Sequence, residues 1–171
     1  MHRMSPFLRN RGALGGVLLI LLGAWGALIP FVGPYFHYAY TPVRAWHFTL
    51  ARLWLEVLPG AAAVLGGVLV IASTRRLPTA GGMLLAGLAG AWFALGTAVT
   101  GLWPRLGTPG VPAGSARQVA LEEIGFFTGL GIVIIFAAAL ALGRCFASAS
   151  ETAPEAPIAG YAAGPGNDPA A

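Results

Sequence analysis

Four long runs of apolar residues, separated by short polar segments, dominate the chain. They cover about residues 13–32, 57–73, 80–102 and 124–142. About 20 helical residues cross a hydrocarbon core of about 30 Å. The runs are apolar throughout, whereas the strands of a membrane barrel alternate, and only a helix satisfies its own backbone in lipid over such lengths. We therefore predict an all-α membrane protein with four transmembrane helices.

The two ends of the chain raise separate questions, namely whether the first helix is a cleaved signal peptide and whether the C-terminal segment is ordered. The run at residues 13–32 follows a basic start, as a signal peptide would, but it is longer than a usual signal core and no small-residue cleavage site follows. We expect this helix to be retained. From Ala147 the sequence is rich in Ala, Ser, Pro and Gly, which predicts a disordered cytoplasmic tail over residues 147–171. Residues 1–146 then form the four-helix transmembrane domain.

The segment before the second run has an amphipathic pattern. At 100° per residue, one face carries Trp46, Leu50, Leu53, Trp54 and Val57, and the other carries Arg44, Thr49, Arg52 and Glu56. We predict an outer interfacial amphipathic helix, begun by Thr41-Pro42 and entering the second span near Pro59. It would act either as a lid over the bundle or only as an interfacial anchor.

The two halves of the chain resemble each other. Leu21-Leu22-Gly23-Ala24-Trp25 is similar to Leu88-Ala89-Gly90-Ala91-Trp92, and Glu56 and Glu123 are separated by the same offset. Each half contains two spans, so a true duplication would be a parallel 2+2 internal repeat about an axis along the membrane normal. The alternative is that glycine- and leucine-rich helices resemble each other by composition alone.

Composition and charge narrow the functional class. The chain is 57% hydrophobic and only 9% charged, whereas a soluble domain carries charge at about a quarter of its positions. The formal net charge is +4, but the arginines are scattered along the chain, which argues against a nucleic-acid partner. Their bias toward one side predicts a plasma-membrane protein with both termini in the cytoplasm.

Residues that could carry chemistry are few. Cys145 is the only cysteine, so an internal disulfide is excluded, and the spacing of His37 and His47 matches no metal signature. No nucleophile has a base beside it in the sequence. We therefore expect no enzyme activity, no cofactor and no metal.

One polar site on the outer face remains a candidate. It consists of Arg52, Glu56, Arg117 and Glu123, all near helix entries. Acidic residues at a helix N-terminus compensate the helix dipole, and Ser115-x-x-Gln118 is a capping box, so these residues are explained without function. The alternative is a proton or cation site that uses Glu56 and Glu123.

Small residues predict how the helices pack. Gly82, Ala86, Gly90 and Ala94 form a ridge along the third span, and Gly125 and Gly129 form a similar pair in the fourth. Such ridges let helix backbones approach closely in lipid. They would serve packing within the chain or an interface with another subunit.

The sequence resembles small four-helix membrane proteins of GC-rich Gram-positive bacteria. The resemblance rests on the tryptophan-rich outer segment, on Leu58-Pro59-Gly60-Ala61-Ala62 and on Gly90-Ala91-Trp92, and it covers about residues 12–144. It implies a fold but no activity. The expected function is that of a structural or accessory subunit whose partners are the lipid bilayer and itself or another membrane protein. The alternative is a small oligomeric carrier or channel.

Overall fold

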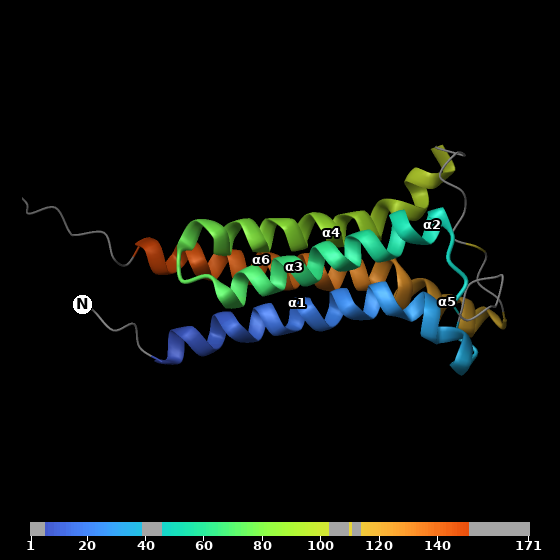
Figure 1. Cartoon of the computed structure of the whole chain (residues 1–171), viewed down its shortest axis with the longest axis horizontal. Helices are drawn as coiled ribbons and strands as arrows, with labels where there is room; N and C mark the ends of the chain where they lie inside the picture. The colour runs from blue at the N-terminus through green and yellow to red at the C-terminus, as the bar shows by residue number, and fades with distance from the viewer. Residues whose placement is uncertain (1–5, 39–45, 103–109, 111–113, 151–171) are drawn as a thin grey trace, which may run out of the picture.

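The computed structural model describes residues 6–38, 46–102, 110 and 114–150, which form a bundle of long helices (Figure 1). The long helices are α1 (Pro6–Val32), α3 (Leu58–Ala72), α4 (Arg76–Leu102) and α6 (Thr128–Ser150). Among the described residues, four segments are long and apolar enough to cross a membrane, namely Ala13–Phe36, Leu50–Ala72, Arg76–Thr100 and Ala116–Phe146. The prediction of an all-helical protein with four helices able to span a membrane is therefore confirmed, and this pattern suggests a multi-pass membrane protein.

Short elements connect the long helices at one end of the bundle. They are the 3₁₀ turn η1 (Gly33–Phe36), the helical turn α2 (Leu50–Arg52), the π-helical segment η2 (Leu53–Val57) and α5 (Ala116–Phe126). Helix α1 packs closely on α3, α3 on α4, and α4 on α6, whereas the contact between α1 and α6 is the loosest of the four. Helices α1 and α4 therefore lie on a diagonal of the bundle.

Two helix boundaries differ from those expected. The second span begins at Leu50 rather than near residue 57, because Thr49 caps the helix by accepting a hydrogen bond from the Arg52 N–H at 3.2 Å. Residues 50–72 then run without a break, so no separate interfacial helix precedes the span in the described part; Thr41-Pro42 lies outside it. The end of α6 is the second boundary that differs, because the helix continues to Ser150, past Ala147, where we expected the tail to start. Residues 151–171 lie outside the described part of the chain.

Glycines set the spacing between the helices. A Cβ atom added to Gly23 of α1 would lie 2.7 Å from the Gly60 carbonyl oxygen of α3. On α4, a Cβ at Gly82 would lie 2.6 Å from the Gly66 carbonyl oxygen of α3. The α4 ridge therefore packs within the chain, as the next contact on it also shows.

Farther along the same ridge, α4 turns from α3 to α6. A Cβ at Gly90 would lie 2.9 Å from the Gly131 carbonyl oxygen, and one at Gly131 would lie 3.0 Å from the Ala94 Cβ. The close approach on α6 thus uses Gly131 rather than the expected Gly125 and Gly129. Helical rotation brings Gly131 onto the face toward α4.

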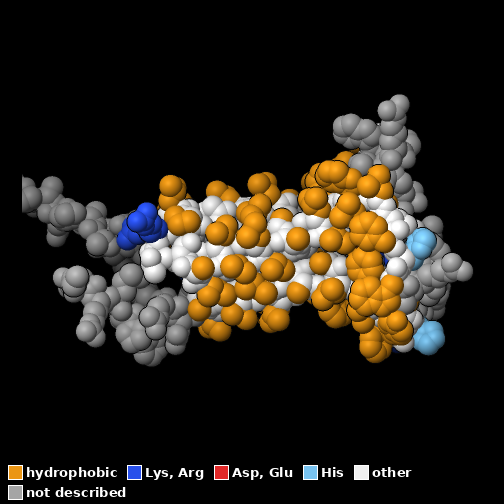
Figure 2. Space-filling model, in the orientation of Figure 1, with side chains coloured by type: hydrophobic (Ala, Val, Ile, Leu, Met, Phe, Trp, Pro, Cys, Tyr) orange, Lys and Arg blue, Asp and Glu red, His pale blue; other side chains and the backbone are white. Residues whose placement is uncertain are grey.

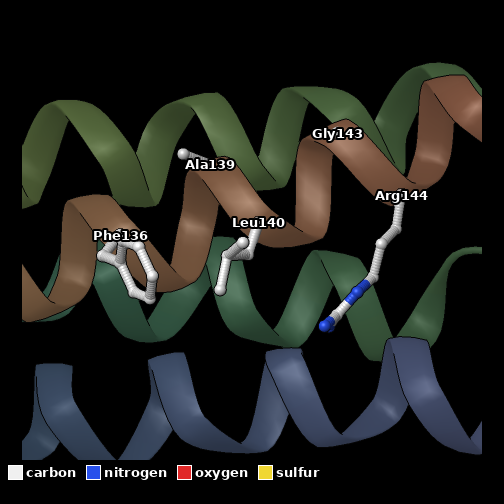
Figure 3. Close-up of a pocket in the computed structure, with 5 residues that line it drawn as sticks. All are labelled: Phe136, Ala139, Leu140, Gly143 and Arg144. Atoms are coloured by element: carbon white, nitrogen blue, oxygen red, sulfur yellow. The ribbon is translucent and has the colours of Figure 1, made fainter.

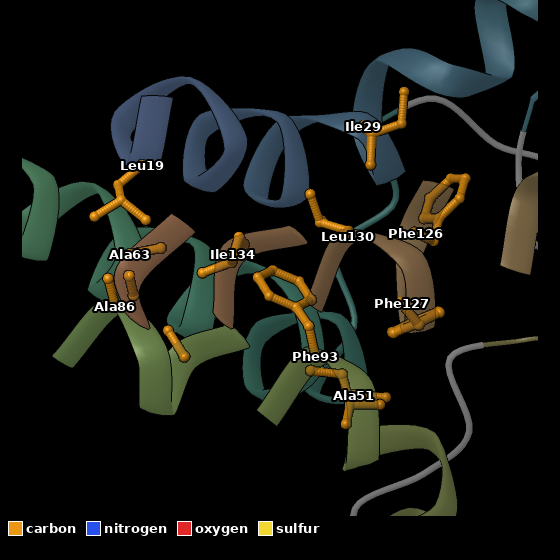
Figure 4. Packing of buried hydrophobic residues seen from close by; sticks show 13 residues of the cluster. Leu19, Ile29, Ala51, Ala63, Ala86, Phe93, Phe126, Phe127, Leu130 and Ile134 are labelled. Carbon is orange, nitrogen blue, oxygen red and sulfur yellow. The ribbon is translucent and has the colours of Figure 1, made fainter. Parts of the chain in front are cut away.

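Phe93 occupies the centre of the bundle. Its side chain is fully buried, and it reaches from α4 across the diagonal to α1, where only the missing side chain of Gly26 leaves room for the ring (Figure 4). Around it lies one continuous apolar core. The core consists of Leu19, Ile29, Ala51, Leu55, Ala63, Ala86, Ala89, Phe93, Phe126, Phe127, Leu130, Ile134 and Ala138.

We predict that Gly90→Ala destabilises the bundle by about 1–3 kcal/mol, because one methyl group would force the α4 and α6 backbones apart. Gly87→Ala is the matched control. A Cβ at Gly87 would lie 3.7 Å from the Ala138 Cβ, an ordinary contact distance. Thermal unfolding in detergent should separate the two variants, and equal stability would contradict the role given to Gly90.

Candidate functional site at the aromatic end of the bundle

Hydrophobic side chains gather at the end of the bundle where the short elements lie, on the face seen in Figure 2, and several of them are aromatic; this end is here called the aromatic end. Phe31 stacks on Trp46 and Phe48, with ring centroids 5.8 Å and 6.4 Å apart. The exposed members are Tyr35, Phe36, Trp46, Phe48 and Trp54. Arg75, Arg76 and Arg144 are exposed at the opposite end, here called the arginine end. Aromatic rings of this kind are typical of a membrane–water interface.

Arg52 is buried beneath the aromatic side chains, with only 3% of its surface exposed. Its Nη1 donates to the carbonyl oxygens of Pro30 at 3.2 Å and of His47 at 2.9 Å. Pro34, four residues after Pro30, has no N–H, so Pro30 lacks the donor that a continuing α-helix would supply. The guanidinium therefore replaces a missing backbone donor at the end of α1.

Glu56 lies one turn beyond Arg52 and is 1% exposed. Its Oε2 has no hydrogen-bond partner among the described residues, and Arg52 supplies the opposite charge nearby. Arg52 and Glu56, which the amphipathic pattern places on the polar face, are therefore both buried in the bundle. The helix has the reverse polarity, with Leu50 and Trp54 exposed and the charged pair inside. At this end backbone carbonyls, rather than water, solvate the guanidinium.

The π-helical segment η2 creates a second carbonyl in need of a donor. The Leu58 N–H donates to the Leu53 carbonyl, five residues back. In the same register the Trp54 carbonyl would accept from residue 59, which is a proline without an N–H. The indole Nε1 of Trp92 donates to this carbonyl at 2.9 Å instead, which ties α4 to the start of the second span.

A third hydrogen bond of this kind closes the junction between α5 and α6. The helix is interrupted at Phe127, whose φ of −128° and ψ of −83° are not helical. Trp25 of α1 donates through Nε1 to the Gly125 carbonyl oxygen beside the interruption, at 3.2 Å. Two tryptophans that match in the sequence, Trp25 and Trp92, thus each donate to a backbone carbonyl at the entry of a span in the other half of the chain.

Tyr38 fixes α5 against the end of α1. Its hydroxyl donates to the Leu121 carbonyl oxygen at 2.6 Å and occupies the space that a side chain at Gly125 would need. Burial, with a smaller contribution from the nearby Glu122 carboxylate, raises the pKa of the Tyr38 phenol. This phenol therefore remains protonated and able to donate at neutral pH.

Glu122 is a fully buried carboxylate that sequence reasoning did not select. The Gln118 amide donates to the His37 carbonyl oxygen at 2.6 Å and to Glu122 Oε1 at 3.5 Å, while Glu122 Oε2 has no partner among the described residues. The signal was present, because Gln118, Glu122 and Phe126 recur every four residues and so share the buried face of α5. Ser115 caps this helix as expected, accepting from the Gln118 N–H at 3.4 Å.

The four residues of the expected polar site do not form one unit. Arg52 and Glu56 are buried together, whereas Arg117 and Glu123 are exposed. Hydrogen bonds engage the backbone carbonyls of His37 and His47, and the described residues contain no group of three potential metal-binding side chains. The observed arrangement is suited to completing the backbone hydrogen bonds of interrupted helices.

We predict that Arg52→Met lowers the free energy of unfolding by about 3 kcal/mol or more, because it orphans two carbonyls and leaves Glu56 without a counter-charge. Adding Glu56→Leu should recover part of this loss. Arg117→Met, an exposed control, should change stability by at most about 0.5 kcal/mol. Denaturation in detergent measures all three, and simple additivity of the Arg52 and Glu56 substitutions would count against their coupling.

Trp92→Phe should cost about 1 kcal/mol or more, since it leaves the Trp54 carbonyl without its donor. In a Pro59→Ala background residue 59 regains an N–H, so the same tryptophan substitution should cost less. A double-mutant cycle read by thermal unfolding measures this coupling. An identical cost of Trp92→Phe in both backgrounds would refute the link to Pro59.

Comparisons with known proteins found no match for this chain. No family model, no curated protein and no solved structure matches the chain.

Proposed function

We propose that this chain is a structural or accessory subunit of the plasma membrane, with both termini in the cytoplasm, that stabilises a partner through its outward apolar faces. The end of α6 and the start of α1 lie at the same end of the bundle (Figure 1). This is the arginine end, which the positive-inside rule favours for the cytoplasm. Reporter fusions at Gly110 and after Ser150 check this orientation, with outside activity expected only at Gly110.

The observation that carries the proposal is the filled centre of the bundle. Phe93 blocks the diagonal, and the glycine contacts on either side of it bring neighbouring backbones into direct contact. Carriers and channels place polar or charged side chains along a path through the bundle interior. Here the buried charged residues lie together at the aromatic end. A single chain thus offers surfaces for association rather than a route for a solute.

A parallel duplication of a two-helix unit fits the same contacts. The Gly23–Gly60 approach between α1 and α3 has its counterpart in the Gly90–Gly131 approach between α4 and α6. The hydrogen bonds of Trp25 and Trp92 correspond in the same way. Both correspondences require that, when the first helices of the two units are aligned, the second helices are offset from each other by about one turn. That shift pairs Glu56 with Phe127 rather than with Glu123, which agrees with the burial of Glu56 and the exposure of Glu123.

One observation favours the alternative of a small oligomeric carrier. Glu56 and Glu122 each bury a carboxylate oxygen that has no hydrogen-bond partner among the described residues. Such groups are candidates for proton or cation binding within a membrane. Their confinement to the aromatic end is the reason that we rank this alternative second.

The two functions differ in two measurable ways. A photoreactive amino acid at outward positions, one on each long helix, should yield a discrete adduct with a different protein from at least one face in native membranes. Suitable positions are Leu14, Leu65, Leu88 and Ile132, each more than half exposed. The same probe at the fully buried Phe93 is the control and should yield none.

Purified chain in vesicles should conduct neither protons nor potassium ions. Proton or potassium flux that Glu56→Gln or Glu122→Gln abolishes would overturn the accessory role and support the carrier. Adducts confined to lipid at all four outward positions would also contradict the accessory role. An adduct with a second copy, together with flux, would support an oligomeric carrier.

A further inference from the structure

One face of α6 carries a continuous row of residues that is open to the membrane. Near the aromatic end, Gly129 and Val133 line a groove of about 350 Å³ together with Leu22 and Trp25 of α1. Phe136, Leu140 and Arg144 continue this row toward the arginine end at intervals of three or four residues. The row thus follows the side of α6 next to its loose contact with α1.

The part of this row near the arginine end is itself hollow. Phe136, Ala139, Leu140, Gly143 and Arg144, here called the α6 groove, line a second space of about 350 Å³. Figure 3 shows Phe136, Leu140 and Arg144 leaving the same side of the helix. A Cβ added to Gly143 would meet no atom within 4 Å, so the groove exists because the glycine leaves it empty.

The chemistry of the α6 groove changes along its length. Phe136 and Leu140 are exposed and wholly apolar, at a position where lipid chains surround the helix. Arg144 lies in the last turn of the span Ala116–Phe146 and carries a guanidinium at the arginine end. A planar guanidinium can donate two parallel hydrogen bonds to a phosphate, and an arginine at this depth meets phospholipid headgroups.

We propose that the α6 groove binds one anionic phospholipid from the leaflet at the arginine end, with its phosphate on Arg144 and an acyl chain along Phe136, Leu140 and Gly143. The match of charge with headgroup and of apolar wall with acyl chain carries this assignment. A second copy of the chain is a poorer occupant, because five residues on one helix offer far less than the about 800 Å² per partner of a standard protein interface. The proposal is independent of the accessory function.

The test uses the full chain in detergent, with phosphatidylglycerol and phosphatidylcholine of identical acyl chains as probes. Native mass spectrometry and thermal unfolding should show tighter binding of phosphatidylglycerol. Arg144→Gln should weaken that binding about fivefold, to the level of phosphatidylcholine. Arg76→Gln, which removes an exposed arginine at the same end, is the matched control and should bind as the unchanged protein does.

A second pair of variants tests the groove itself. Gly143→Leu should fill it and weaken the binding of both lipids without loss of fold, since the added side chain enters open space. Gly81→Leu, at a glycine of α4 that also has no atom within 4 Å of an added Cβ, should bind as the unchanged protein does. Equal lipid binding by the two arginine variants, or by the two leucine variants, would overturn the proposal. So would a change of oligomeric state in Gly143→Leu without a change in bound lipid, since a second copy would then fill the groove.

Discussion

Backbone carbonyls that lose their helical donors control the arrangement of the aromatic end. In an apolar medium an unpaired carbonyl is costly, because no water replaces the missing N–H. Pro34 and Pro59 remove two such donors, and the interruption at Phe127 disturbs a third site. The Arg52 guanidinium and the indoles of Trp92 and Trp25 donate to the affected backbone, each from a different part of the bundle. Each of these hydrogen bonds is therefore also a tertiary contact that holds the start of a span against a neighbouring helix.

The same constraint explains why charge is buried in a chain that has so little of it. Arg52 replaces a backbone donor, so it must lie inside, and Glu56 accompanies it as a counter-charge one turn away. Once both charges are inside, the other face of the segment is free to present Leu50 and Trp54 to the membrane interface. The polarity of this helix thus follows from an unpaired carbonyl on α1, which the helix's own amphipathic pattern does not reveal.

The sequence predicted what periodicity and length determine and missed what depends on a distant partner. Run lengths located the four spans, and the Ser115 cap is a local pattern. The direction of Arg52 depends on Pro30, and the close approach of α6 depends on which of its glycines meets Gly90. Neither can be read from one helix, because an amphipathic pattern gives faces but does not say whether protein, lipid or water covers them. Glu122 differs from these two cases, because the four-residue spacing of Gln118, Glu122 and Phe126 does mark one face of α5, although it does not say that protein covers that face.

The four neighbouring helix pairs do not pack equally closely, and this difference determines which side of the bundle is open to its surroundings. Three neighbouring helix pairs are drawn together by glycine contacts with backbone, because close approach supplies most of the attraction between helices in lipid. The α1–α6 pair is the exception: a Cβ at Gly26 would meet side chains, those of Phe93 from α4 and Leu130 from α6, and one at Gly125 would meet Tyr38. At Gly26 the close contacts are thus with side chains and not with the α6 backbone, unlike the glycine contacts in the other three pairs. The contact between α1 and α6 is the loosest of the four, and the α6 side chains of Val133, Phe136 and Leu140 are exposed. The residues that fill the centre and anchor α5 thus leave this side of the bundle as the one where a lipid can enter between side chains.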